Sequence, residues 1–214
     1  MEFLPTLPVF VAFTLASVVL IITPGPDMTL FLGKTLTQGQ SAGMAAMLGA
    51  TAGNVVHTLL AAFGISALLA ASPSAFAALK FAGAIYLLWL AFSAIRHGSA
   101  LRLDRARVEA RPIRQVFLTG VAINLLNPKI ILFFVTFLPQ FIETGDEHAR
   151  GKLLFLGLYM IALALPSCAA MIIAASRIAR LVQRSPLVTR VIDWLFASVF
   201  AGFAVVLLTE RAEM

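Results

Sequence analysis

The sequence predicts an all-α, polytopic membrane protein, and three observations carry this prediction. The 214-residue chain is 60% hydrophobic and only 12% charged, whereas soluble domains carry about 25% charged residues. Several apolar stretches approach the roughly 20 residues that a helix needs to cross a bilayer. Two of these stretches are interrupted by proline. We therefore expect six transmembrane helices, arranged as two inverted three-helix repeats with broken helices 1 and 4.

The first expected span runs from about residue 7 to residue 22, and then the stretch Thr23–Asp27 interrupts it. Pro24 and Pro26 lack backbone N–H groups, and each ring clashes with the carbonyl four residues earlier. Gly25 adds a permissive backbone between them. We expect a half-helix to begin after the break, at Met28, and to end at Lys34.

Asp27 would lie at or near lipid depth, where a carboxylate costs about 2.5 to 3.5 kcal/mol. Such a break persists only where protein buries it or where it lines a water-filled cavity. We expect the first apolar run to be retained as a span, not cleaved as a signal peptide. No basic residue precedes it, and no A-x-A-like site follows it.

Five further spans are expected, at about residues 43–69, 75–95, 115–141, 153–175 and 191–208. The second span carries Gly49 and Gly53 four residues apart, a spacing that lets two helices approach closely. The fourth span is interrupted in its middle by Pro128. The fifth span contains Pro166, where we expect a kink.

The whole chain is expected to form one transporter domain. Its predicted parts are repeat one, a cytoplasmic linker and repeat two, at residues 1–95, 96–114 and 115–214. When Pro26 is aligned with Pro128, Asp27 falls on Lys129. Three spans in each half require the halves to have opposite orientations. Proline-interrupted segments at matching positions of inverted halves are typical of a transporter site at the repeat interface.

The basic residues give the expected topology. Arginines concentrate in the loops 96–114 and 177–190, whereas Arg150, Lys152 and Arg211 lie on the opposite side. The positive-inside rule places both termini outside the cytoplasm. Topology therefore explains the net charge of +6, and no nucleic-acid partner is expected. The lipid bilayer is the expected surrounding, and a homodimer is left open.

The candidate substrate- or proton-binding site draws on both breaks and on the second span. Its residues are Pro24, Gly25, Pro26, Asp27, Asn54, His57, Asn124, Asn127, Pro128 and Lys129. A broken helix frees N–H groups that suit a carboxylate and carbonyls that suit an ammonium group. A zwitterionic amino acid needs both kinds of partner.

Several alternatives stay open for these residues. Asp27 is an ammonium ligand, a proton carrier or the N-cap of the half-helix that follows it. Lys129 meets a substrate carboxylate, reaches a cytoplasmic vestibule or pairs with Asp27, and we slightly favour the pairing. For Asn54, Asn124 and Asn127, interhelical hydrogen bonds are the default and ligand contact is the alternative. His57 is either a packed hydrogen-bonding group or a proton relay.

Other functional classes find little support. Cys168 is the only cysteine, so no disulfide or cysteine-based metal site is expected within the chain. The sequence contains neither a zinc-protease H-E-x-x-H motif nor a hydrolase G-x-S-x-G motif nor a P-loop. We expect no enzymatic activity, no cofactor and no metal.

Three motifs resemble the LysE/RhtB-type amino-acid exporter family. They are Pro24-Gly25-Pro26-Asp27, Gly53-Asn54, and the stretch Asn124–Lys129 with the Phe-rich segment 133–141 behind it. The resemblance covers the whole chain. It implies a secondary exporter in the bacterial inner membrane, driven by the proton gradient. Known substrates of the family include lysine, arginine, threonine, homoserine, leucine and cysteine-type compounds, and no residue here chooses among them.

The predicted function is therefore secondary active export of an amino acid or close derivative, by proton antiport. One alternative is an exporter of a small cation or metal, although the chain lacks the ligand cluster that transition metals prefer. A second alternative is a membrane subunit without transport activity.

Overall fold

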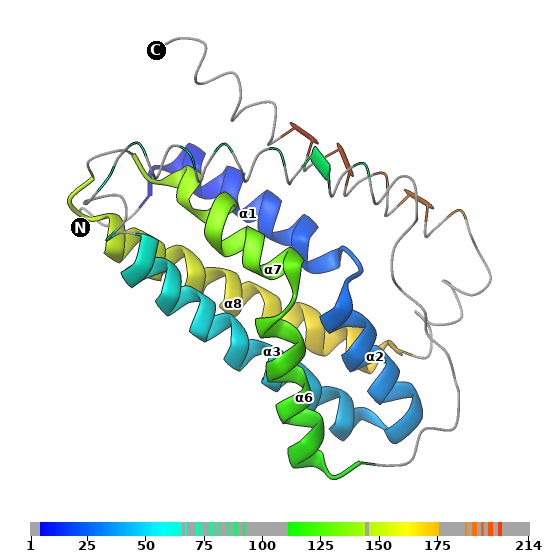
Figure 1. Ribbon diagram of the computed structural model, residues 1–214. Coiled ribbons are helices and arrows are strands. Elements are labelled where there is room, and N and C mark those ends of the chain that lie inside the picture. Colours follow the sequence, from blue (N-terminus) through cyan, green and yellow to red (C-terminus); the bar gives the residue numbers. More distant parts are fainter. Residues whose placement is uncertain are drawn as a thin grey trace.

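The computed structural model describes residues 5–65, 111–143 and 146–175, with isolated positions between 67 and 92 and between 187 and 202. All regular elements in this part of the chain are helical, which confirms the all-α prediction (Figure 1). The expected spans 75–95 and 191–208 lie mostly outside the described residues, as does most of the linker 96–114. The inverted six-helix arrangement therefore remains a prediction.

The N-terminal part contains α1 (Leu7–Ile22), α2 (Pro26–Gln38), α3 (Gln40–Leu60) and the π-helical turn η1 (Ala61–Ile65). Helix α2 begins two residues earlier than predicted, because Pro26 occupies its first turn, where a missing N–H costs nothing. It also continues past Lys34. Gly39, with φ of 89°, makes the sharp connection between α2 and α3.

The second part contains α6 (Ile113–Leu125), α7 (Pro128–Leu132), the π-helical turn η2 (Phe133–Phe137), the 3₁₀ turn η3 (Leu138–Phe141) and α8 (Ala149–Ile173). Pro166 lies inside α8. The break predicted in the middle of the fourth span is confirmed, since α6 ends just before Asn127 and Pro128.

Two unbroken helices are long and apolar enough to cross a membrane, namely the 26 residues Gln40–Ile65 and the 25 residues Ala149–Ile173. Two more spans result if each broken pair counts as one. The bend is 48° between α1 and α2, and 50° between α6 and the helical segment from Pro128 to Phe141. The described residues thus hold two to four candidate spans.

Helices α3 and α6 pack closely because glycine lies on both sides of the contact. A Cβ atom at Gly49 would lie 2.1 Å from the carbonyl oxygen of Phe117. A Cβ atom at Gly120 would lie 2.3 Å from the carbonyl oxygen of Ala46. Backbone atoms cannot yield as a flexible side chain does, so any larger residue here would push the helices apart.

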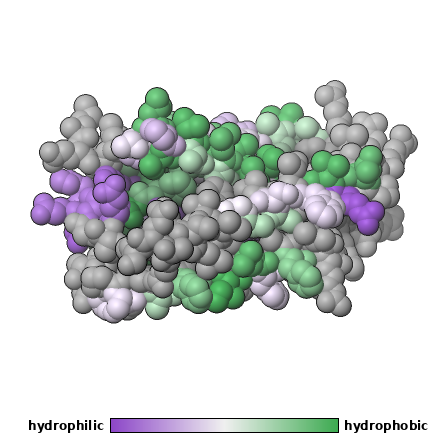
Figure 2. Space-filling model, turned by 90° about the horizontal axis from the view of Figure 1, so that it is seen from above, coloured by the Kyte–Doolittle hydropathy of each residue, from purple (hydrophilic) through white to green (hydrophobic). Residues whose placement is uncertain are grey.

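An aromatic cluster fills the space between α1, the segment after α7, and α8. Phe13, Phe133, Phe134 and Phe137 are each at most 2% exposed, and Phe141 meets the Phe13 ring edge-on at 5.1 Å. Many large apolar side chains are also exposed on the outer surface of the described residues. Figure 2 shows hydrophobic side chains over the middle of one face and the most hydrophilic ones towards its ends, as a bilayer-crossing protein requires.

Candidate functional site

Asn124 links three helices at the centre of the structure. Its Nδ2 atom donates to Oδ2 of Asp27 at 2.8 Å and to Oδ1 of Asn54 at 3.0 Å. The side chain is fully buried. Because Asp27 lies on α2, Asn54 on α3 and Asn124 on α6, these bonds join the first break to the second span and to the helix before the second break.

Gly53 makes room for this link. A Cβ atom at Gly53 would lie 2.3 Å from Oδ1 of Asn124. The four-residue spacing with Gly49 predicted a close helix contact here, but it did not predict that an asparagine side chain fills the space. Gly53 therefore belongs to the site, although it was absent from the candidate residues.

Lys129 reaches from the second break to the first. Its Nζ atom donates to the main-chain carbonyls of Leu20 at 3.1 Å and Thr23 at 2.8 Å, where α1 ends. Gly25 lies against the end of this side chain, since a Cβ atom there would be 3.2 Å from Nζ. The expectation that freed carbonyls suit an ammonium group agrees with this contact, but the ammonium belongs to the protein itself.

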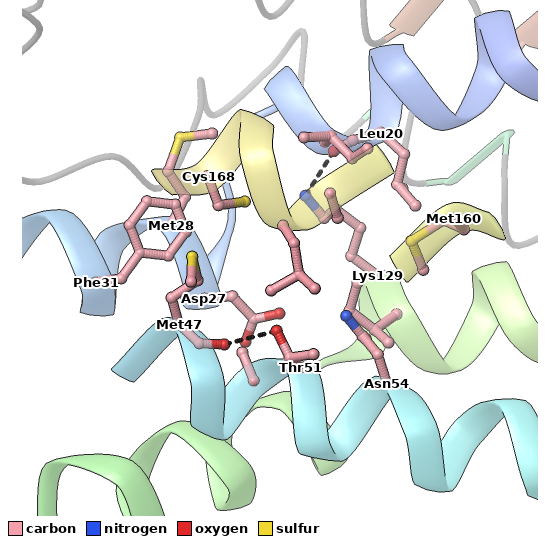
Figure 3. Close-up of a pocket in the computed structure, with 15 residues that line it drawn as sticks. Leu20, Asp27, Met28, Phe31, Met47, Thr51, Asn54, Lys129, Met160 and Cys168 are labelled. Carbon is pink, nitrogen blue, oxygen red and sulfur yellow. Dashed lines mark hydrogen bonds between the residues drawn. The ribbon is translucent and has the colours of Figure 1, made fainter. Parts of the chain in front are cut away.

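The favoured pairing of Asp27 with Lys129 is not found. Within the described part of the chain these two side chains form no salt bridge, because Asn124 holds Asp27 while two carbonyls hold Lys129. In Figure 3 the Lys129 ammonium turns towards Leu20, whereas Asp27 lies near Thr51. The two side chains still act on each other electrostatically.

Asp27 is also not the N-cap of α2. Gly25 holds that position and offers no side chain to the helix, so Asp27 lies in the first turn. There its carboxylate faces the positive end of the helix dipole. Its Oδ1 atom is buried and accepts no hydrogen bond from the residues that the structure describes. This oxygen therefore keeps an unused capacity to accept a hydrogen bond, and the side-chain amide of Asn127, whose Nδ2 atom is also without a partner there, acts on the same carboxylate.

The helix that follows the second break, α7, is capped by a residue of the break itself. Oδ1 of Asn127 accepts a hydrogen bond from the backbone N–H of Lys129 at 3.1 Å, which makes Asn127 the N-cap of α7. Pro128 occupies the first position of α7, as Pro26 does in α2. Pro24 is buried within the first break. These prolines shape the breaks, whereas the polar contacts come from their neighbours.

His57 is a packed residue at the edge of this network. Its Nε2 atom lies 3.4 Å from the main-chain oxygen of Asn124, and its ring stacks on Phe134 with 5.5 Å between centroids. The side chain is 7% exposed and does not line the cavity that Asp27 and Lys129 border. These contacts support the structural alternative for His57.

Asp27 and Lys129 border one cavity of about 70 Å³, which lies between the two breaks (Figure 3). Asn54 and Thr51 add polar groups to its wall. Most of the remaining wall is apolar or sulfur-containing: Leu20, Ile21, Met28, Phe31, Met47, Ala50, Ile130, Met160, Ala164, Leu165 and Cys168. Such a cavity holds several water molecules or a small part of a ligand.

Among the described residues, no three His, Cys, Asp or Glu side chains lie close enough together to hold a metal ion. The polar groups at the cavity are instead one carboxylate, one ammonium, one amide and one hydroxyl. This set matches the charged groups of a small organic molecule more closely than a metal coordination shell.

These features define an integral membrane protein whose broken helices meet at a mainly apolar cavity that carries one carboxylate and one ammonium group. The family model of the LysE type translocator matches residues 18–211. The chain therefore belongs to the LysE type translocator family, as its motifs indicated.

Individual relatives agree with this assignment. The chain is 28% identical over 203 residues to a leucine efflux protein of Klebsiella pneumoniae subsp. pneumoniae, with 95% of this chain and 96% of that protein covered. It is 32% identical over 206 residues to a membrane protein of Vibrio cholerae serotype O1, with 95% and 98% covered. A leucine efflux protein of an Enterobacter species is 28% identical over 197 residues, with 91% and 92% covered. No solved structure matches the chain significantly.

Proposed function

We propose that this protein is a secondary active exporter that moves an amino acid out of the cytoplasm in exchange for protons. One observation carries the proposal: a carboxylate and an ammonium border the same cavity without pairing with each other. Two unpaired opposite charges on one cavity are complementary to a zwitterion. A direct salt bridge between Asp27 and Lys129 would have neutralised both charges and weakened the attraction of each for a ligand.

Each charged group has a position open for the substrate. Oδ1 of Asp27 is buried and accepts no hydrogen bond from the described residues, so it would accept from a substrate ammonium that enters the cavity. The Lys129 ammonium uses two of its three hydrogens on carbonyls and has no third acceptor among the described residues, so one hydrogen remains for the substrate carboxylate. Charge-assisted hydrogen bonds of this kind are about twice as strong as neutral ones.

Asp27 also offers a route to proton coupling. The substrate ammonium and a proton compete for the same carboxylate. If Asp27 takes up a proton from outside and releases it inside when substrate binds, export of substrate is exchanged for import of a proton. Rocking of two inverted halves around the breaks would expose the cavity to each side in turn.

Leucine is the first substrate to test, because two relatives are named as leucine efflux proteins. The apolar walls of the cavity, including Met28, Met47 and Met160, suit a neutral aliphatic side chain. The expected location is the bacterial inner membrane, with both termini outside the cytoplasm. Assembly as a homodimer remains part of this proposal.

The proposal is tested by efflux from cells loaded with leucine-containing dipeptides, which release leucine inside. Cells with the wild-type protein should export leucine faster than cells without it. Asp27→Asn should lower this rate by about 30-fold or more, because removing one partner of a buried charged contact costs about 2 kcal/mol or more. Glu143→Gln is the matched control, since Glu143 is exposed and lies outside the cavity.

Further dipeptides extend the test to other amino acids, and an uncoupler separates proton-driven export from facilitated export. If no amino acid leaves faster with the wild-type protein, the proposed function is wrong. If export survives the uncoupler unchanged, the antiport mechanism is wrong and the transport function stands.

A further inference from the structure

We infer that the end of α1 forms a binding site for a primary ammonium group, built from the carbonyls of Leu20 and Thr23 beside Gly25, and that Lys129 fills this site from the other half of the chain. We call these three residues the ammonium socket. The role of the socket in transport rests on the proposed function, but the socket itself does not.

The carbonyls of the socket are available because of how α1 ends. The last carbonyls of a helix have no partner within the helix and carry partial negative charge. At this end the carbonyl of Val19 is already used, since it accepts from both the N–H and the hydroxyl of Thr23, at 3.0 Å and 2.6 Å. The carbonyls of Leu20 and Thr23 accept from Nζ of Lys129.

Gly25 supplies space, not unusual backbone geometry. Its φ of −164° and ψ of −179° are extended values that any residue adopts. A Cβ atom at this position would, however, lie 3.2 Å from Nζ and 3.3 Å from Cε of Lys129. The glycine therefore allows the end of the lysine side chain to lie against the break.

The socket supplies the hydrogen-bond acceptors of the Lys129 ammonium, so this group makes no hydrogen bond to the nearby carboxylate. Asp27 on α2 and Cys168 on α8 are the titratable groups that act on Lys129, and His57 on α3 acts on Asp27. Within the part of the chain that the structure describes, none of these three side chains forms a hydrogen bond with Nζ of Lys129. Carbonyl dipoles stabilise the ammonium, so the Asp27 charge stays available to the cavity.

This arrangement makes Leu20, Thr23 and Gly25 positioning residues for Lys129. They direct its ammonium so that one hydrogen remains for a substrate carboxylate. The socket lies in the first half of the chain and the lysine in the second. The carboxylate contact is therefore complete only when the two breaks lie against each other.

Truncating the lysine and supplying a soluble amine tests the socket directly. Purified Lys129→Ala should unfold at a lower temperature than the wild type. Propylammonium should raise that temperature in a concentration-dependent manner, because a bound ligand stabilises the folded state. Tetramethylammonium should not, since it has the same charge but no N–H group. Adding Gly25→Val, which fills the socket, should abolish the effect of propylammonium.

Two results would overturn the socket: no shift with propylammonium, or an equal shift with tetramethylammonium. If Lys129→Ala cannot be recovered folded, the unfolding temperature of Gly25→Ala is compared with that of Gly33→Ala. A Cβ atom at Gly33 meets nothing within 4 Å. The socket requires that Gly25→Ala unfolds at a lower temperature than the wild type, because two carbonyls hold Lys129 in place, whereas Gly33→Ala should not. A Gly25→Ala protein as stable as the wild type would contradict the socket. These measurements need no transport, so failure of the wild type to export amino acids remains a separate result.

Discussion

The two broken helices have nearly the same bend but satisfy their backbone groups in different ways. The bends are 48° at the first break and 50° at the second. At the second break Asn127 caps α7 with its own side chain, and its N–H bonds to the carbonyl of Asn124. At the first break Gly25 contributes no side chain, and the end of α1 receives its donor from Lys129.

This difference shows that the second break is locally complete, whereas the first depends on the second. Asn124 and Lys129, both beside the second break, supply the hydrogen bonds to Asp27 and to the end of α1. The first break therefore keeps a carboxylate oxygen without a hydrogen-bond donor among the described residues, on a side chain that lines the cavity. Similar backbone geometry does not make the two halves equivalent in function.

The largest expected effect comes from Asn124→Ala, which removes the link between the breaks. Oδ2 of Asp27 and Oδ1 of Asn54 would both lose their donor, and each buried group left unpaired costs about 1–3 kcal/mol. We expect a clear fall in the unfolding temperature of the purified protein and loss of leucine efflux. Wild-type stability together with wild-type efflux would show that the first break does not depend on Asn124.

A smaller effect is expected from Gly53→Ala, which keeps Asn124 but displaces it. The added methyl group would overlap Oδ1, Cβ and Cγ of Asn124, and overpacking of this kind costs about 1–3 kcal/mol. Thermal unfolding measures the loss. Gly33→Ala is the control because its surroundings are open. Equal stability of the two variants would contradict the close packing of Asn124 against Gly53.

The smallest effect is expected from Asn127→Ala, which removes the cap of the second break and the weaker action of the Asn127 amide on Asp27. Loss of an N-cap costs about 1 kcal/mol, and Asn127→Ser should recover most of it. Chemical unfolding of the three proteins measures both values. Efflux should fall less than in Asn124→Ala. An equal or larger loss would mean that Asn127 contacts substrate and is more than a cap.

The sequence predicts the breaks well and the contacts across them poorly. Proline chemistry is local, so Pro26 and Pro128 mark the interruptions correctly. The sequence pattern predicts a start of α2 at Met28, two residues too late, because it does not show that Pro26 belongs to the first helical turn, where proline is favourable. The alignment of Asp27 with Lys129 suggested a pair, but alignment does not give side-chain direction.

Tertiary packing supplies what the sequence could not indicate. Met160 and Cys168 reach the cavity from α8, which is distant in sequence from both breaks. The carbonyls that hold Lys129 belong to Leu20 and Thr23, and a main-chain oxygen carries no residue-specific signal. The π-helical turns at 61–65 and 133–137 are likewise absent from the prediction, because packing sets such local changes in hydrogen bonding.

The central claim is that the cavity between Asp27 and Lys129 binds a zwitterionic amino acid, and Cys168 offers the most direct test. It is the only cysteine of the chain, it is partly buried, and it lines this cavity. The measurement is the rate at which N-ethylmaleimide alkylates the purified wild-type protein. Leucine should slow alkylation, whereas leucinamide and N-acetyl-leucine, which each lack one charge, should not. Equal protection by all three compounds, or protection by none of the exported amino acids, would contradict the claim.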